Sequence, residues 1–410
     1  MKIGAIADDL TGATDLALIL SRAGFSVLQM VGVPDGGDLG DTDAVVVSLK
    51  SRTIPAAEAV AQSLAAGRAL LAAGAQQLYF KYCSTFDSTD DGNIGPVTDA
   101  LLDLVGARGT IACPAFPANG RTIYQGHLFV GDRLLSESSM RDHPLTPMRD
   151  ADLVRVLGRQ SSRDVSLIAL PAVRAENLGE RFAAIDGIAI VDAVEDADLM
   201  KIGRAASRLK LVTGGSGAAM GLPANFGAVP GQAPKLDWPS GKGVVLAGSC
   251  SKATLGQVQH YKSLGAAGLG VDPVSISTGK VTLDQAEAFA RDNVGDLPPL
   301  VYSSAAPDAV AEQQKQLGTM AAGEIVERFL AELAGRLKAS GFTRFVVAGG
   351  ETSGAVVGGL GVPALHIGPE IDPGVPWTRG SSENGPLALA LKSGNFGAVD
   401  FFSKAWNLLP

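Results

Sequence analysis

The sequence predicts an α/β protein of two domains, each a mostly parallel sheet flanked by helices, with an active-site cleft between the domains. Short apolar runs alternate with longer helix-like segments along the chain, a pattern typical of repeated strand–helix–strand units. The length of 410 residues exceeds that of a single compact core. Glycine contributes 51 residues, well above the usual roughly 7 %, which suits tight corners between strands and helices.

The first predicted domain covers residues 1–222. Helices are expected over Ala13–Ala23, which Gly24 ends, over Ala56–Ala73 and near Val97–Val105. The alanine-rich 56–73 helix would suit either the core or the interface of a homodimer. Short apolar runs predict the strands, at Ile3–Ala7, Ser26–Gly32, Ala44–Leu49, Gln77–Tyr82, Gly109–Pro114, Asp164–Leu170, Ile188–Asp192 and Lys210–Thr213.

Residues 223–242 are predicted to be a linker, because they carry four prolines and several glycines with little periodicity. A second domain is predicted over residues 243–410, where the strand–helix alternation resumes. Its strands are expected at Gly243–Leu246, Ala267–Val271, Leu300–Ser303, Phe345–Ala348 and Leu365–Ile367. Its helices are expected at Lys252–Ser263, Leu283–Asp292, Gly323–Ser340 and Ser353–Leu360.

Composition excludes several classes of partner. The net charge of −8 argues against nucleic acid and anionic membrane surfaces, which require basic faces, but not against a small anion in a local pocket. No apolar run reaches the roughly 18–20 residues of a membrane span, and the first residues lead straight into a strand, so we expect no signal peptide. The three cysteines form no C-x-x-C pair, which favours a reducing cytoplasm over disulfides or a zinc site.

Glycine-rich turns with hydroxyl side chains follow three predicted strands or apolar runs of the second domain. Gly349-Gly350-Glu351-Thr352-Ser353-Gly354 lies between the strand Phe345–Ala348 and a helix, where free backbone N–H groups form an anion site. Gly248-Ser249-Cys250-Ser251 and Lys392-Ser393-Gly394 have the same chemistry, although no G-x-x-x-x-G-K-[ST] sequence is present. Together these turns predict phosphate binding. Gly214–Gly221 does not fit G-x-G-x-x-G and is interpreted as a structural corner.

Charged side chains follow the predicted strands of the first domain. Asp8 and Asp9 come directly after the first strand, at the edge of an open α/β sheet where ligands bind. Either carboxylate could accept a hydroxyl proton or cap the next helix. Lys81, at the end of a strand and before the hydroxyls of 84–89, suits an anionic substrate but could also be a solvated edge charge.

Cys113–Arg121 is a rigid proline-containing loop that ends in an arginine suited to a carboxylate. The following stretch is unusually polar and includes Asp132 and His143. Its histidines are not spaced as H-x-x-x-H, so we do not predict a metal site there.

These motifs resemble those of the four-carbon acid-sugar kinase family over nearly the whole chain. The matching segments are A-D-D-L-T-G-A-x-D at Ala7–Asp15, Lys81–Thr89 with G-N-I-G-P-V at Gly92–Val97, C-P-A-F-P-x-N-G-R at Cys113–Arg121, G-S-C-S at Gly248–Ser251, A-G-G-E-T-S-G at Ala348–Gly354 and K-S-G-N-F-G at Lys392–Gly397. K-Y-C-S-T-F-D-S-T at Lys81–Thr89 is most similar to the 3-oxo-tetronate kinase branch. The threonate and erythronate kinase branches carry a D-S-T-L-R-G type sequence there, and this chain lacks that arginine.

The resemblance implies an acid-sugar-binding first domain, a nucleotide-binding second domain, and transfer of phosphate from ATP with Mg²⁺ to the 4-hydroxyl of a four-carbon 3-oxo acid. It implies ATP binding by Ser251, Gly349, Gly350, Glu351, Thr352 and Gly394. We expect substrate contacts from Arg52, Lys81, Ser84, Asp87, Arg121 and His143. The aspartate that activates the hydroxyl is expected to be Asp9, then Asp8, then Asp132. Alternatives are a threonate or erythronate kinase, a nicotinamide-dependent dehydrogenase and a non-enzymatic small-molecule binding protein.

Overall fold

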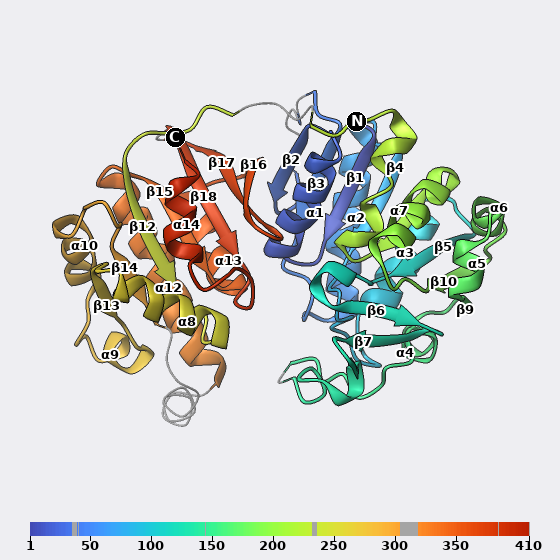
Figure 1. Ribbon diagram of the computed structural model, residues 1–410, viewed down its shortest axis with the longest axis horizontal. Helices are drawn as coiled ribbons and strands as arrows, with labels where there is room; N and C mark the ends of the chain where they lie inside the picture. Colours follow the sequence, from blue (N-terminus) through green and yellow to red (C-terminus); the bar gives the residue numbers. More distant parts are fainter. Residues whose placement is uncertain are drawn as a thin grey trace. The chain divides into compact units, whose positions relative to one another are not determined.

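The computed structural model describes residues 1–34, 39, 41–143, 145–231, 236–303, 319–383 and 385–409. It divides into two compact units, residues 1–234 (unit 1) and 235–410 (unit 2). Each unit contains one sheet with helices on its faces, parallel in unit 1 and mostly parallel in unit 2 (Figure 1). This confirms the predicted α/β fold class. None of the described helices combines the length and the hydropathy that a bilayer crossing requires.

The sheet of unit 1 is parallel throughout its described strands. Its order is β2-β3-β1-β4-β11-β5-β10-β9. The chain runs from β1 to β2 on one side and later crosses from β3 to β4 on the other, so β1 and β4 flank the topological switch point, where ligands bind in such sheets. The strands are Ile3–Ala7 (β1), Val27–Val31 (β2), Ala44–Ser48 (β3), Gln77–Lys81 (β4), Gly109–Cys113 (β5), Val165–Ile168 (β9), Gly187–Val191 (β10) and Leu211–Gly214 (β11).

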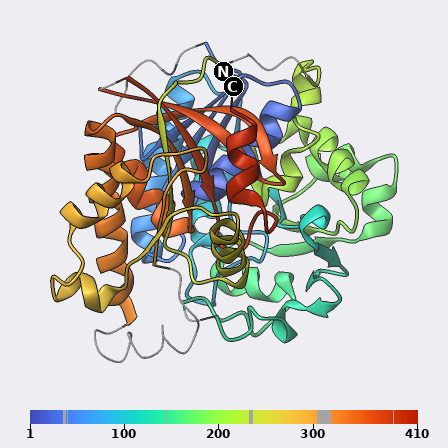
Figure 2. The same cartoon turned by 60° about the vertical axis from the view of Figure 1, so that its left-hand side comes forward.

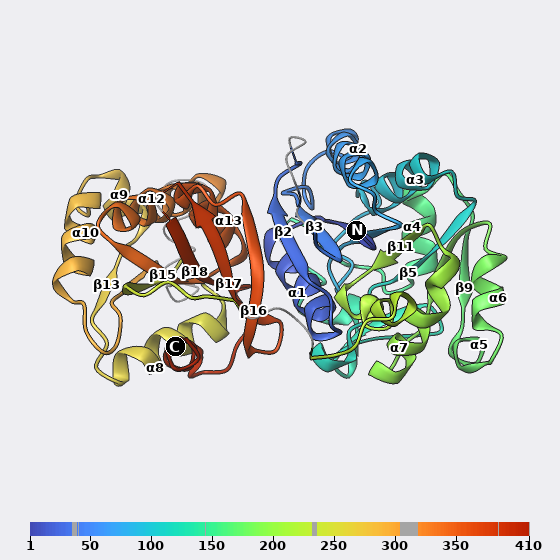
Figure 3. The same cartoon turned by 90° about the horizontal axis from the view of Figure 1, so that it is seen from above.

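Helices cover both faces of this sheet. Figure 3 shows α2 and α3 on one face and α1 and α7 on the other. The helices are Leu10–Arg22 (α1), Ala56–Ala72 (α2), Ile94–Val105 (α3), Leu153–Gln160 (α4), Leu170–Arg174 (α5), Leu178–Ala183 (α6) and Asp196–Ala205 (α7). Short 3₁₀ turns are Pro117–Asn119 (η1), Leu135–Glu137 (η2), Ala206–Arg208 (η3), Ser216–Ala219 (η4) and Pro223–Phe226 (η5).

A small antiparallel sheet of unit 1 was not anticipated from the sequence. It consists of Arg121–Tyr124 (β6), His127–Val130 (β7) and Arg133–Leu134 (β8) and lies beyond the carboxyl ends of the parallel strands (Figure 1). The β6–β7 turn takes positive φ at Gln125 and Gly126. The N–H groups of both residues donate to the buried Asp192 carboxylate at 2.8 and 2.9 Å. The Asp192 carboxylate, at the end of β10, therefore fixes the β6–β7 hairpin. The polar sequence of the hairpin alone does not indicate this structure.

Unit 2 has a mixed sheet in the order β13-β14-β12-β15-β18-β17-β16. The first five strands are parallel, and β18, β17 and β16 are antiparallel neighbours. The strands are Lys242–Ala247 (β12), Gly268–Gly270 (β13), Leu300–Tyr302 (β14), Phe342–Ala348 (β15), Ala364–Asp372 (β16), Val375–Ser382 (β17) and Gly385–Lys392 (β18). β17 was not predicted, because proline, glycine and polar residues interrupt its apolar pattern, and β18 was not predicted although Leu387–Leu391 is an uninterrupted apolar run.

The helices of unit 2 lie on both faces of its sheet. Figure 3 shows α12 and α13 on one face and α8 and the C-terminal helix on the other. In Figure 2 this last helix, α14, lies against the red strands. The helices are Lys252–Ser263 (α8), Pro273–Ser277 (α9), Leu283–Asp292 (α10), Thr319–Ala339 (α12), Gly350–Leu360 (α13) and Phe401–Asn407 (α14).

The stretch predicted to be a linker, 223–242, contains the point at which the units divide. Its first residues pack on unit 1, where the Asn225 side chain donates to the Gly203 carbonyl at 3.0 Å. Its last residues pack on unit 2, where Arg344 Nε donates to the Pro239 carbonyl at 2.9 Å. Both ends of the stretch are therefore tied to one unit or the other.

Replacement of Trp377 tests the packing of α14 on the sheet of unit 2. The Trp377 side chain is fully buried, and its Nε1 donates to the Ala405 carbonyl of α14 at 2.9 Å. We predict that Trp377→Ala lowers the free energy of unfolding of unit 2 by about 3–5 kcal/mol, as measured by urea denaturation. Leu264→Ala, at a residue 48 % exposed, should cost less than about 1 kcal/mol. Equal losses would contradict this packing.

Candidate functional site

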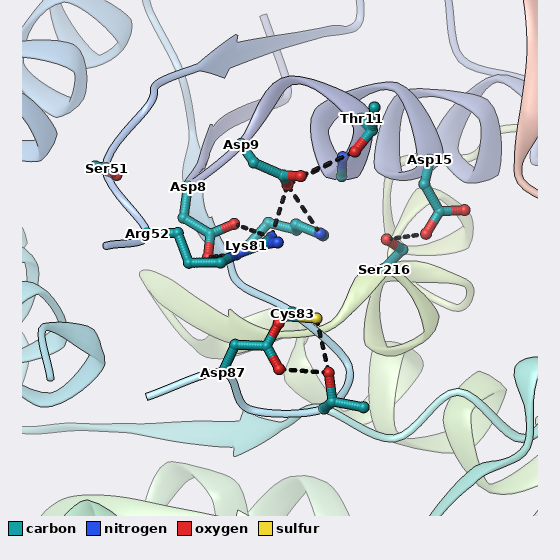
Figure 4. Close-up of polar contacts among 12 residues, drawn as sticks. Asp8, Asp9, Thr11, Asp15, Ser51, Arg52, Lys81, Cys83, Asp87 and Ser216 are labelled. Carbon is teal, nitrogen blue, oxygen red and sulfur yellow. Dashed lines mark hydrogen bonds and ion pairs between the residues drawn. The ribbon is translucent and has the colours of Figure 1, made fainter. Parts of the chain in front are cut away.

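An ion cluster joins the ends of the central strands of unit 1 (Figure 4). Arg52 Nε and Nη2 donate to both oxygens of Asp8 at 2.8 Å, and Nη2 also donates to Asp9 Oδ1 at 2.7 Å. Lys81 Nζ lies 3.7 Å from the same Asp9 oxygen. Four residues from the ends of β1, β3 and β4 thus share one charge network.

Local backbone contacts explain why these side chains meet. The backbone N–H groups of Ser51 and Arg52 donate to the Asp8 carbonyl at 3.0 and 3.2 Å, and the Asp8 N–H donates to the Lys81 carbonyl at 3.1 Å. Asn93 Nδ2 donates to the Ser51 carbonyl at 2.7 Å. The loop that carries Arg52 is therefore fixed between the strand ends and the start of α3.

Asp9 also begins helix α1. Its Oδ1 accepts the Gly12 N–H at 3.0 Å, as an N-cap does, and its Oδ2 accepts the Thr11 hydroxyl at 2.9 Å. A Cβ on Gly12 would lie 1.9 Å from Lys81 Nζ. Only glycine at this position lets the ammonium approach the helix start.

The charges in this cluster shift one another's pKa values. Burial acts to raise the pKa of Asp9, but Arg52 and Lys81 outweigh it and lower the value to about 2. Burial raises the pKa of Asp8, and Arg52 opposes that effect. Burial also acts to lower the pKa of Arg52, but the two carboxylates hold it well above its usual range. Asp9 is thus a permanently ionised anchor at neutral pH, and Arg52 is permanently cationic.

Lys81 has fewer partners than its burial would lead one to expect. Its side chain is 6 % exposed. Among the described residues, its only polar partner is Asp9, at the long distance given above. A buried ammonium normally has its three donors satisfied, so the Lys81 ammonium retains donor capacity for a further anion.

The turn after β4 carries three polar side chains in a chain of hydrogen bonds. Thr85 Oγ1 donates to Asp87 Oδ1 at 2.5 Å and lies 3.0 Å from Cys83 Sγ. Arg52 and Lys81 act electrostatically on this thiol, which places the turn beside the ion cluster (Figure 4). Ser84 is half-buried in the same turn.

The other sequence-predicted residues of unit 1 lie on the small sheet and the segment after it. Arg121 starts β6, and its Nη1 donates to the Asn119 carbonyl. Asp132 is exposed between β7 and β8, and His143 Nδ1 accepts the Thr146 N–H at 3.2 Å. Within the described part of unit 1, none of these three side chains has a hydrogen bond or ion pair to the ion cluster.

In unit 2, three predicted turns lie together because β12, β15 and β18 are neighbours. The N–H groups of Gly248 and Ser249 donate to the Ala348 carbonyl at 3.0 and 3.2 Å, and the Gly349 N–H donates to the Lys392 carbonyl at 2.9 Å. The Gly394 carbonyl accepts the Ser251 hydroxyl at 2.5 Å. The ends of three strands are therefore linked into one surface.

Two of these turns, 248–250 and 349–352, line a pocket of about 350 Å³. Gly349, with φ of 129°, precedes α13 and leaves its first turn without a side-chain cap. A Cβ on Gly248 would lie 2.2 Å from the Thr352 hydroxyl. The lining residues are Gly248, Ser249, Cys250, Pro273, Ser303, Ala322, Gly323, Val326, Glu327, Gly349, Gly350, Glu351 and Thr352. A wall rich in backbone N–H groups at a helix start suits a phosphate chain.

Lys392 is buried beneath this surface and is fully shielded from solvent. Its ammonium donates to Thr254 Oγ1 and to the carbonyls of Ser393 and Gly394, each at 3.0 Å. None of the described acidic side chains pairs with it, and burial lowers its pKa to about 7. Lys392 therefore holds the 393–394 turn in place.

Sequence reasoning missed several residues of these two sites. Thr11 and Gly12 escaped notice because helix α1 was expected to begin later. Lys392 belonged to a recognised motif and Thr254 to a predicted helix, but nothing in the sequence showed that they bond to each other. Helix α12 supplies one wall of the pocket through Gly323, Val326 and Glu327. No motif in its sequence marks these residues as part of a binding site. The described residues contain no group of three His, Cys, Asp or Glu side chains placed to hold a metal ion.

Comparisons with known proteins match the two parts of the chain to two different domain families. Residues 3–222 match a family model described as a sugar-binding N-terminal domain, and residues 244–402 match one described as a nucleotide-binding C-terminal domain. A protein of Burkholderia multivorans named 3-oxo-tetronate kinase is 56 % identical, covering 99 % of this chain and 97 % of its own length. Another with the same name, from Cupriavidus necator, is 56 % identical, covering 98 % and 96 %. The family resemblance predicted from the sequence is confirmed.

Solved structures share the architecture. A Haemophilus influenzae protein has a TM-score of 0.82 at 44 % identity, with coverage of 99 % of this chain and 100 % of that one. A Salmonella typhimurium protein described as a putative tRNA synthase has a TM-score of 0.88 at 42 % identity, covering both chains fully.

Lys392 makes the stability of unit 2 depend on pH. Its pKa is about 7 in the folded state against an ordinary 10.5, so between these values the unfolded chain binds more protons. The free energy of unfolding of the wild type, relative to Lys392→Met, should therefore rise with pH from 7 towards 10.5, by about 1 kcal/mol per pH unit. Urea titrations at pH 7, 8 and 9 measure this slope.

The control is Lys252→Met, because Lys252 is exposed on the same unit. Its difference from the wild type should stay constant across the same pH range. A flat difference for Lys392→Met would show that this ammonium carries no burial penalty.

Proposed function

The chain belongs to the family that combines a sugar-binding N-terminal domain with a nucleotide-binding C-terminal domain, and we propose that it is an ATP-dependent 3-oxo-tetronate kinase. The reaction would transfer the γ-phosphoryl group of ATP to the 4-hydroxyl of 3-oxo-tetronate, giving the 4-phosphate and ADP. The observation that carries the proposal is identity of 56 % over 99 % of the chain to a relative of that name. The acidic charge balance of −8 gives no support to an RNA substrate.

Unit 1 would bind the acid at the ion cluster. Lys81 supplies an ammonium with donor capacity to spare, and Arg52, 23 % exposed, supplies a second cation beside it. A substrate carboxylate would satisfy the unused donors of Lys81 through charge-assisted hydrogen bonds. We assign Asp8 and Asp9 the task of holding these two cations in place. We expect Ser84, Arg121 and His143 to serve the hydroxyl-bearing part of the substrate.

Unit 2 would bind ATP in its glycine-lined pocket. Gly349, Gly350, Glu351 and Thr352 line the pocket directly. Ser251 and Gly394 would act from its rim, since a Cβ on Gly394 would lie 2.3 Å from the hydroxyl of the lining residue Ser249. The close packing of Gly394 against Ser249 leaves no room for a side chain at position 394.

Mg²⁺ would be bound largely by the phosphates, as it usually is in kinases. The carboxylates of Glu327 and Glu351 are the acidic groups that line the pocket. When bound, the ion neutralises charge on the transferring group. Pocket and ion would position the γ-phosphoryl group, and the cluster of unit 1 would present the acceptor hydroxyl; positioning and charge neutralisation account for most of phosphoryl-transfer catalysis.

The nearest alternative is a threonate or erythronate kinase of the same family. The turn Cys83–Asp87 favours the 3-oxo acid, because its sequence is most similar to that branch and lacks the arginine of the D-S-T-L-R-G type sequence. The family and the names of the relatives favour a kinase over a dehydrogenase or a binding protein.

The direct test measures ADP release with ATP and Mg²⁺ for freshly prepared 3-oxo-tetronate beside the D and L forms of threonate and erythronate. We predict turnover with the 3-oxo acid and at least about tenfold lower kcat/KM with the others. Turnover confined to threonate or erythronate would move the chain to the alternative branch. An increase in Tm with ATP but no turnover with any acid would reject the proposed substrate class.

Lys81→Met tests the carboxylate site. Loss of a charge-assisted hydrogen bond costs about 1.5–3 kcal/mol, so kcat/KM for the acid should fall roughly 10- to 150-fold, mainly through KM. The increase in Tm caused by ATP should not change. Lys210→Met, at an exposed lysine of unit 1, serves as the control. An unchanged KM in Lys81→Met would mean that another group binds the carboxylate.

A further inference from the structure

Phosphoryl transfer from ATP to a hydroxyl needs an acceptor for the hydroxyl proton. At the edge of the unit 1 sheet, Asp8 and Asp9 already accept hydrogen bonds from the protein. Both oxygens of Asp8 are bonded to Arg52. Asp9 accepts from Thr11, from the Gly12 N–H and from Arg52. Every oxygen of these two carboxylates already accepts at least one hydrogen bond, which stabilises the ionised form and makes the oxygen a weaker acceptor for a substrate proton.

The third aspartate suggested by the sequence, Asp132, lies in a different environment from the ion cluster. Asp132 is exposed in the turn that joins β7 to β8. In the part of the chain that the structure describes, it has no hydrogen bond or ion pair that would orient it. An exposed, unoriented carboxylate offers no positioned proton acceptor.

Asp87 differs from all three. Its Oδ1 accepts the Thr85 hydroxyl at 2.5 Å, and its Oδ2 has no donor among the described residues. The side chain is half-buried, and Asp87, Arg52 and Lys81 all act electrostatically on the Cys83 thiol, which Figure 4 draws between Asp87 and the ion cluster. One oxygen is thus held by the protein and the other remains available.

The backbone around Asp87 is specialised for this placement. Phe86 has φ of 51°, a left-handed conformation that a bulky residue adopts rarely and at some cost. Its ring is fully buried and lies 5.5 Å from that of Tyr82, edge to face. Burial of this ring offsets the strain and turns the chain so that Thr85 and Asp87 face each other.

The hydrogen-bond chain has a defined direction. Thr85 has one hydroxyl proton, which it donates to Asp87, so the Cys83 thiol at 3.0 Å must donate to Thr85. Burial and the nearby Asp87 charge raise the pKa of Cys83 to about 11, so the thiol keeps its proton at neutral pH. Asp87 Oδ1 therefore accepts the Thr85 hydroxyl, and Oδ2 is the oxygen that accepts no hydrogen bond from the described residues.

We propose that Asp87 is the catalytic base that accepts the proton of the substrate hydroxyl, an assignment that rests on the proposed kinase function. The hydroxyl oxygen forms a bond to the γ-phosphorus as the bond from that phosphorus to the β,γ-bridging oxygen breaks. The electron pair of the broken bond leaves with ADP. The hydroxyl proton moves to Asp87 Oδ2 and afterwards to solvent.

The test compares Asp87→Asn with the wild type in the ADP-release assay, at saturating ATP and Mg²⁺. Asparagine retains an oxygen for Thr85 but cannot take the proton, so kcat should fall about 10²- to 10⁴-fold. KM for the acid should change less than about fivefold, and the ATP-induced rise in Tm should persist. Asp91→Asn is the matched control, because Asp91 is exposed four residues along the same loop, and its kcat should equal that of the wild type.

A second variant covers the case in which Asp87→Asn does not fold. Asp87→Glu keeps the carboxylate but displaces it by one methylene, and we expect it to retain between about 1 and 10 % of the wild-type kcat. Asp87→Asn with more than a tenth of the wild-type kcat, or with a loss confined to KM, would overturn the proposal. So would Asp87→Glu with full activity. An inactive wild type would instead reject the kinase function itself.

Discussion

The structure of the acid-binding edge depends on one interaction, the pairing of Arg52 with two adjacent carboxylates. Asp8 and Asp9 follow each other in the chain, and without a cation between them their like charges would repel at the end of β1. The guanidinium fork bridges both, which fixes the loop after β3 against β1. This pairing also sets the position of Asp9, which in turn begins α1 and lies beside Lys81. Removal of Arg52 would leave the buried Asp8 charge uncompensated.

Unit 2 solves the corresponding problem without carboxylates. The Gly394 carbonyl accepts from Ser251, Thr254 and Lys392, so one backbone oxygen ties two turns and a buried ammonium together. Neutral oxygens take all three donors of the buried Lys392 ammonium, and burial lowers its pKa to about 7, so this side chain acts as a structural tie between the turns. The two units thus hold their strand ends together by different means: an ion-pair network in unit 1 and a lysine bound by neutral oxygens in unit 2.

The sequence predicted the parallel strands of unit 1, strands β12–β16 of unit 2, roughly half of the helices and the turns that bear the sites, because apolar runs and glycine signals are local. It also predicted that the turns of the second domain bind phosphate together. It could not predict pairings between residues far apart in the chain, such as Arg52 with Asp8 or Lys392 with Thr254. The β6–β7 hairpin was missed because the carboxylate that fixes it, Asp192, comes more than sixty residues later. The order Asp9, Asp8, Asp132 compared residues of one type and favoured the pair that follows the first strand, whereas the donors to each carboxylate oxygen are set by the fold.

The measurement that tests the central claim most directly is calorimetric titration of the protein with an analogue of 3-oxo-tetronate that lacks the 4-hydroxyl, as the carboxylate and as the carboxamide. If the pairing of Arg52 with Asp8 and Asp9 leaves Lys81 to receive a carboxylate, the carboxylate should bind at least about tenfold more tightly, the equivalent of one charge-assisted hydrogen bond. Equal affinity for both compounds would contradict the account, because the cation beside Asp9 would then have no part in recognising the acid.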